Sequence, residues 1–265
     1  MHTNDMATWL SETDLSELLA SVRVDGRNSV GVAGEIRQGL SDMLRTVSNR
    51  VGSHRRVRLF ACACLRRVWD LLQIEGARRI VELAESYADG EVSAAELHGA
   101  TTHPSFDGVE DRFYGAEPRL SIRTGEAITA AQWLASPTFN TNEAAEIASN
   151  TSKDPTQDYF RAPESEGHPA WVAPSDVERA EQVRLLWELF GNPLCPVNFN
   201  PDWRTPTVVG FAVQIYESRD FSAMPILADA LQDAGCDNEV ILSHCLGAGP
   251  HVRGCWVVDQ ILEKE

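Results

Sequence analysis

The chain has 265 residues, of which 43% are hydrophobic and 23% are charged, and its formal net charge is −16. The length is ample for a sizeable core, and the acidic balance argues against a general nucleic-acid or anionic-membrane binder. No apolar run approaches the length of a membrane span, and the N-terminus has no basic or apolar leader region. We therefore expect a cytoplasmic protein without a membrane segment.

Nearly every periodic segment of the first hundred residues predicts a helix. The strongest pattern runs over residues 53–72, where apolar side chains fall at steps of three and four. Ser93 followed by Glu96 predicts a capping box that opens a short helix. The helices expected in this part span residues 8–22, 35–47, 53–72, 76–88 and 93–100.

The middle of the chain is less regular. Residues 101–125 predict mostly loop, because histidine-proline and several glycines interrupt any period. Residues 126–134 and 141–150 are rich in alanine and predict short helices. Residues 151–174 are polar and contain four prolines, which is typical of a linker.

The C-terminal third predicts a series of helices on tight turns. Thr205-Pro206 is a strong helix start, because threonine can cap the helix and proline fits its first position. Pro250 is expected to open the last helix in the same way. The helices expected here span residues 176–190, 205–218, 222–234, 237–245 and 250–263.

No segment of the sequence shows convincing β alternation, so the predicted fold class is all-α. Short connections favour antiparallel neighbours, and no fixed repeat period is present. We expect an irregular multi-helical array of two lobes, residues 1–100 and 175–265. A loop-rich connecting segment with short helices, residues 101–174, is expected to join them into one cofolded unit.

Positive charge is concentrated in one stretch of this acidic chain. Residues 50–79 hold eight arginines against two carboxylates. A basic face could bind an acidic segment of a partner, or it could be a solvated helix face paired with nearby carboxylates. The candidate partner-binding residues are Arg55, Arg58, Arg66 and Arg67.

Metal-binding side chains are dense in residues 236–265, which hold three of the six cysteines and two of the seven histidines. If Pro250 begins a helix, His251 and Cys255 lie at positions i and i+4 and share one face, as helical metal ligands do. The turn and helix before them carry two further candidates. The candidate zinc ligands are Cys236, His244, His251 and Cys255, in a pattern without a Cys-x2-Cys knuckle.

Two other interpretations of this cluster stay open. A cysteine could act as a nucleophile with His251 as its base, if the thiolate were stabilised. The cysteines could equally be small buried hydrophobic residues, as free thiols in a reducing cytosol usually are. The sequence contains no phosphate-binding loop, dinucleotide-binding glycine motif, zinc-protease helix or serine-hydrolase elbow.

Three blocks of the sequence carry a resemblance to a known family. They are residues 58–69 (RLFACACLRRVW), residues 190–206 (FGNP through WRTP) and residues 224–259 (MPILADAL through HVRGCWVVD). Together they resemble a helical family found in many copies in planctomycete-type bacteria. The resemblance implies a bacterial cytosolic protein folded as one unit, and it implies no activity or substrate. Members usually read Cys-Cys where this chain has Cys64-Leu65, which argues against a metal site in the first block.

The absence of a catalytic motif and the local positive charge together suggest a function. We expect a non-catalytic helical module that binds an unidentified protein partner or serves as a scaffold, without a cofactor. The arginine face, near a groove between the lobes, is the candidate surface. The alternative is a structural zinc site or a thiol-based site formed by the C-terminal cysteines and histidines.

Overall fold

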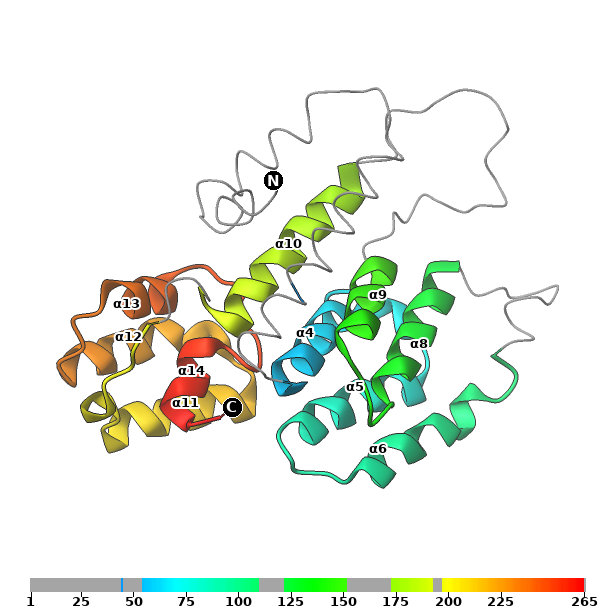
Figure 1. The fold of residues 1–265 in the computed structure, drawn as a ribbon, viewed down its shortest axis with the longest axis horizontal. Helices are drawn as coiled ribbons and strands as arrows, with labels where there is room; N and C mark the ends of the chain where they lie inside the picture. The colour runs from blue at the N-terminus through cyan, green and yellow to red at the C-terminus, as the bar shows by residue number, and fades with distance from the viewer. Residues whose placement is uncertain (1–43, 45–53, 110–121, 152–172, 193–196, 265) are drawn as a thin grey trace, which may run out of the picture. The chain divides into compact units, whose positions relative to one another are not determined.

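The computed structural model describes residues 44, 54–109, 122–151, 173–192 and 197–264. Within these residues the chain forms ten α-helices and no strand, which confirms the predicted all-α class (Figure 1). The helices expected at 8–22 and 35–47 lie outside the described residues, apart from Leu44, as does most of the proline-rich stretch 151–174. No helix of the described part is long and apolar enough to cross a membrane.

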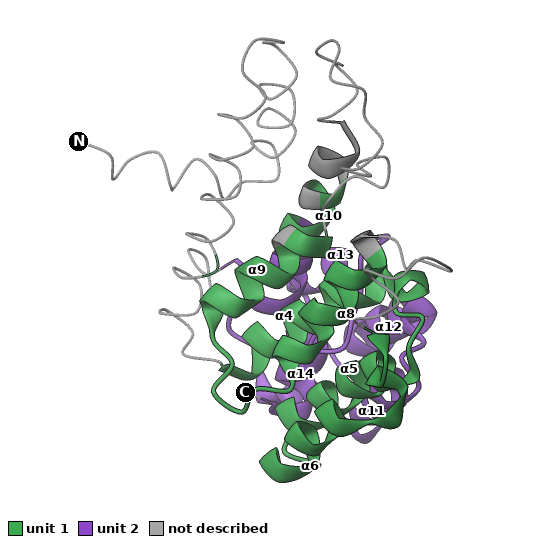
Figure 2. Cartoon of the chain, turned by 90° about the vertical axis from the view of Figure 1, so that its right-hand side faces the viewer, with its two compact units in different colours: residues 1–183 green, residues 184–265 purple. Residues whose placement is uncertain are grey.

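The chain divides into two compact units, residues 1–183 and 184–265 (Figure 2). The boundary falls inside helix α10, which spans Ala173–Phe190. The short helices expected at 126–134 and 141–150 are present as α8 and α9, and both pack in the first unit.

The first unit is a layered arrangement of helices around α4. The α4 helix packs against α5, α8 and α9, and α5 packs against α6 and α8. Every residue of α4 from Val57 to Leu65 is buried, so burial extends beyond the apolar stripe predicted for residues 53–72 and includes Arg58. The α-helices span His54–Arg67 (α4), Glu75–Ala88 (α5), Ala94–Gly99 (α6), Ile122–Leu134 (α8) and Thr141–Thr151 (α9). Short 3-10 helices span Trp69–Leu71, Ala100–Thr102 and Pro104–Phe106.

Two helix starts in this unit depend on serine. Ser93 Oγ accepts a hydrogen bond from Glu96 N, so the predicted cap of α6 is confirmed. The α5 helix begins after Ile74, which has no side-chain acceptor. Ser105, from a distant turn, accepts from Gly76 N at 2.8 Å instead, and its hydroxyl also contacts His103 Nδ1 at 2.8 Å. The 103–106 turn therefore supplies the cap that the sequence before α5 lacks.

We expect Gly76→Ala to destabilise the first unit by about 1–3 kcal/mol. An added Cβ would lie 2.5 Å from Phe106 Cε2 and 2.8 Å from Ser105 Oγ, so the capping turn must shift. Urea denaturation measures the loss. Gly99→Ala is the matched control: it ends α6, has nothing within 4 Å of its added Cβ, and should be neutral or slightly stabilising. Equal stabilities for the two variants would contradict the capping role of this turn.

The second unit has its own apolar core. The α11 helix packs against α12 and α14, and α13 packs against α12 and α14. Thr205 Oγ1 accepts a hydrogen bond from Val208 N, which confirms the predicted start of α11. Asn238 caps α13, and the helix begins at Glu239, two residues after the expected start at residue 237. The helices span Pro206–Ser218 (α11), Met224–Asp233 (α12), Glu239–Leu246 (α13) and Trp256–Leu262 (α14), with 3-10 turns at Pro201–Trp203 and Phe221–Ala223.

The prediction that Pro250 opens the last helix is wrong. Residues 247–255 form a non-helical segment, and α14 begins only at Trp256. The physical reason is Gly254, whose φ of +94° a right-handed helix cannot contain. His251 and Cys255 therefore do not share a helix face, and any meeting of their side chains depends on the path of this segment.

Candidate metal centre

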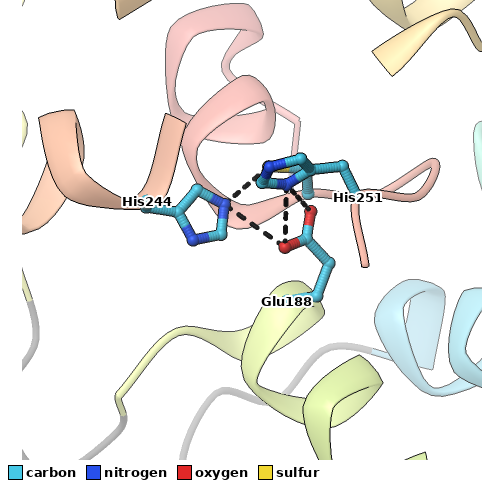
Figure 3. Close-up of side chains that lie close together, drawn as sticks. Glu188, His244 and His251 are labelled. Carbon is cyan, nitrogen blue, oxygen red and sulfur yellow. Dashed lines mark hydrogen bonds and ion pairs between the residues drawn. The ribbon is translucent and has the colours of Figure 1, made fainter. Parts of the chain in front are cut away.

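Four ionisable side chains of the second unit converge in one place. Their potential ligand atoms all lie within 4.8 Å of one another, and they belong to Glu188, His244, His251 and Cys255. Figure 3 shows Glu188 rising from the end of α10 between His244, on α13, and His251, on the segment before α14. Three of the four zinc ligands expected from the sequence thus lie together, and the fourth member of the group is Glu188.

Local structure explains why these side chains point inward. Glu188 lies in the last turn of α10, and the flanking Leu185 and Leu189 are fully buried. Glu188 is itself buried, with only 4% of the residue exposed. His244 lies in the last turn of α13, and the non-helical segment after it carries His251 and Cys255 back toward α10.

The hydrogen-bond partners of His251 show the role of each of its two ring nitrogens. Nε2 lies 3.2 Å from the carbonyl oxygen of Gly247, which can only accept, so Nε2 carries a proton. Nδ1 faces Glu188 and lies 3.2 Å from each carboxylate oxygen. This is the arrangement of a metal-binding histidine, with one nitrogen aimed into the site and the other donating to a backbone carbonyl.

His244 is held by different partners. Its Nε2 lies 3.2 Å from Cys255 Sγ and 3.3 Å from a Glu188 oxygen. Its Nδ1 accepts a hydrogen bond from Trp256 Nε1 at 3.1 Å. The ring also packs edge-to-face against both His251 and Trp256, with centroid distances of 5.1 Å.

Burial and the charge of Glu188 shift the pKa values of His244, His251 and Cys255 in different directions. Burial lowers the pKa of His244 more than Glu188 raises it. For His251, burial also lowers the pKa, but the hydrogen bonds and charge of Glu188 outweigh it and the net pKa is raised. Burial, reinforced by the Glu188 charge, raises the pKa of Cys255 well above its ordinary value. The thiol therefore stays protonated near neutral pH unless a cation replaces the proton.

Cys236 is not a member of this group. It is 5% exposed and packs in the apolar core of the second unit, with Cys245 and Ile241 in the same cluster. Burial raises the pKa of Cys245 to about 12, so this thiol also behaves as a small buried hydrophobic group. The sequence did carry a signal for Glu188, since it is the one charge inside the run Leu185-Leu186-Trp187-Glu188-Leu189-Phe190.

The four arginines expected to bind a partner all have contacts within the first unit. Arg58 is buried, donates to the carbonyl oxygens of Leu134 (2.5 Å) and Ser136 (2.9 Å), and lies over two aromatic rings. The other three pair with carboxylates: Arg55 with Asp89, Arg66 with Glu85, and Arg67 with Glu178. Three of the four arginines are therefore paired with carboxylates, which was the alternative interpretation of the basic stretch. A partner-binding role for the four arginines stays a prediction.

Comparison with known proteins finds no matching family model, no significantly similar curated protein and no significantly similar solved structure. The resemblance to the planctomycete-type helical family therefore stays a prediction.

Proposed function

We propose that the second unit binds one zinc ion through Glu188, His244, His251 and Cys255, as the structural centre of a non-catalytic helical module. The observation that carries this proposal is the convergence of four potential ligand atoms within 4.8 Å, from three separate parts of the chain. Thiolate, imidazole and carboxylate are the ligands that zinc accepts in proteins.

The distances support tetrahedral coordination. With Zn–N near 2.0 Å and Zn–S near 2.3 Å, neighbouring ligand atoms of a tetrahedral site with one sulfur are separated by about 3.3–3.5 Å. The His244 Nε2 to Cys255 Sγ distance is 3.2 Å, and the His251 Nδ1 to Glu188 distance is 3.2 Å. Small side-chain movements would therefore bring these atoms to the corners of a zinc site.

Charge balance also favours a divalent cation. When His251 is protonated, its charge balances the Glu188 carboxylate 3.2 Å away, and the metal-free group is neutral. With zinc, the two charges of the ion are balanced by the Glu188 carboxylate and the Cys255 thiolate, and the group is neutral again. A buried site avoids a large desolvation cost in both states.

Four protein ligands favour a structural role over a catalytic one. Catalytic zinc sites usually keep one coordination position for water or substrate, whereas structural sites are closed by the protein. The raised pKa of Cys255 also argues against a nucleophilic thiol, which needs a stabilised thiolate. For the use of the module, we retain protein binding or scaffolding.

Elemental analysis of protein purified without chelator tests the proposal. About one zinc per chain is expected, and it should be removable only by a strong chelator. Cobalt(II) bound in its place should show thiolate-to-metal charge-transfer absorption, because Cys255 is a ligand. Protein that contains no metal, and binds none when zinc is added, would refute the proposal.

Zinc binding should release protons, and the number should depend on pH. Below the raised pKa of His251, two protons leave, one from His251 Nδ1 and one from Cys255 Sγ; above it, only the thiol proton leaves. As pH rises through the raised pKa of His251, the slope of log K against pH should therefore fall from two to one. Calorimetry in buffers of different ionisation enthalpy measures this number. Binding that releases no protons would contradict the ligand assignment.

A further inference from the structure

One hydrogen bond of the candidate centre opposes metal binding. Trp256 Nε1 lies 3.1 Å from His244 Nδ1, and an indole nitrogen can only donate. Nδ1 must therefore be the unprotonated nitrogen of His244. In a neutral imidazole the proton then lies on Nε2, the nitrogen that faces Glu188 and Cys255.

The partners of Nε2 agree with this assignment. An Nε2–H can donate to the Glu188 carboxylate 3.3 Å away. In the metal-free group, Trp256 therefore donates to His244, and His244 donates to Glu188.

Coordination of zinc by His244 requires the other tautomer. A metal binds the lone pair of Nε2, so the proton must move to Nδ1. Two donors, Nδ1–H and the indole N–H, would then face each other at hydrogen-bond distance. The indole must turn away or give up its hydrogen bond before His244 can bind the ion.

We propose that the Trp256–His244 hydrogen bond is a latch: it weakens zinc binding by the second unit and must break when His244 binds the ion. This inference rests on the proposed zinc function and adds its regulation. Trp256 is therefore a positioning residue: it sets the tautomer of a ligand without touching the metal.

The position of Trp256 gives the latch a structural consequence. Trp256 is the first residue of α14, and the residue before it, the ligand Cys255, makes no side-chain cap on this helix. The indole is 7% exposed and packs against the backbone of Gly191, at the end of α10. Zinc would bind Cys255 and, by binding His244, break the hydrogen bond of Trp256. We therefore expect the metal-free and zinc-bound states to differ at the start of α14.

Two measurements on the full chain test the latch. In metal-free protein, long-range ¹H–¹⁵N spectra of the histidine rings should show His244 protonated on Nε2, and zinc should move the proton to Nδ1. Trp256→Phe removes the opposing donor, so this variant should bind zinc roughly three- to tenfold more tightly than the wild type. Trp203→Phe is the control, since Trp203 lies in the same apolar core and contacts Phe199 rather than the site.

The outcomes separate this inference from the proposed function. An Nδ1–H tautomer of His244 in metal-free wild-type protein would overturn the latch, and this readout needs no variant to fold. Zinc bound with equal affinity by wild type and Trp256→Phe would overturn the latch but leave the zinc function standing. No zinc bound by either protein would refute both.

Discussion

Replacing Cys255 by serine should lower the zinc affinity of this protein by at least about a hundredfold, because four ligands share the roughly 10–16 kcal/mol that a structural zinc site supplies. Serine keeps the size of the side chain, but its hydroxyl does not ionise near neutral pH and cannot balance the second charge of the ion. Competition with a chromogenic chelator measures the affinity, and dialysed protein should lose its metal.

Cys245→Ser is the matched control for this experiment. Cys245 is as fully buried as Cys255 and belongs to the same unit, but it is not a member of the ligand group. Both variants place a hydroxyl in the core, so both should lose some stability without metal. Only wild type and Cys245→Ser should gain about 4 kcal/mol at a zinc concentration of roughly a thousand times Kd. Equal zinc affinities for the two variants would show that Cys255 is not a ligand.

Replacing Arg58 by methionine should destabilise the first unit by about 1–3 kcal/mol, the cost of leaving a buried carbonyl oxygen without its donor. The substitution removes the donor to the Leu134 oxygen, whereas the Ser136 oxygen keeps its hydrogen bond from Phe139 N. It also removes a cation from over the rings of Tyr87 and Phe139. Burial also lowers the pKa of Arg58, as expected for a cation inside a core. Urea denaturation followed by circular dichroism measures the loss.

A second arginine of the same region provides the comparison. Among the described residues Arg79 pairs with Glu82 on its own helix, and it is half exposed, so Arg79→Met should cost no more than about 0.5 kcal/mol. If Arg58→Met were equally harmless, Arg58 would be free to serve a partner, as expected from the sequence. A large loss of stability would identify Arg58 as a structural residue and leave the partner surface to be sought elsewhere.

Local signals predicted much of the helical architecture. Ser93 caps α6 and Thr205 caps α11 as expected, because a capping side chain acts within three residues of its own position. The Pro250 prediction failed for an equally local reason. Proline is compatible with a helix start, but it does not enforce one, and the positive φ of Gly254 moves the start of α14 to Trp256.

The site was predicted in part. His244, His251 and Cys255 lie close in sequence, and their density was enough to identify them. Glu188 lies 63 residues from His251 in the chain, and no spacing rule connects the two. The sequence predicts Cys236 as the fourth ligand because it is a cysteine close to the other three. In the structure its side chain packs in the apolar core instead.

The contacts of the arginines in residues 50–79 could not be predicted for the same reason: their partners are distant in the sequence. A charge count along the chain shows an excess of positive charge, but the balancing carboxylates come from other elements. Glu85 pairs with Arg66 across 19 residues, and Glu178 pairs with Arg67 across 111. Only the fold brings these partners together, so the sequence could not distinguish a paired face from a binding face.

X-ray absorption at the zinc edge of the purified protein tests the central claim most directly. The proposed centre predicts one sulfur at about 2.3 Å and three nitrogen or oxygen atoms at about 2.0–2.2 Å, in tetrahedral geometry. This first shell corresponds to Cys255, His244, His251 and Glu188. A first shell without sulfur, or with two or more sulfurs, would contradict the assignment of the zinc site to these four residues.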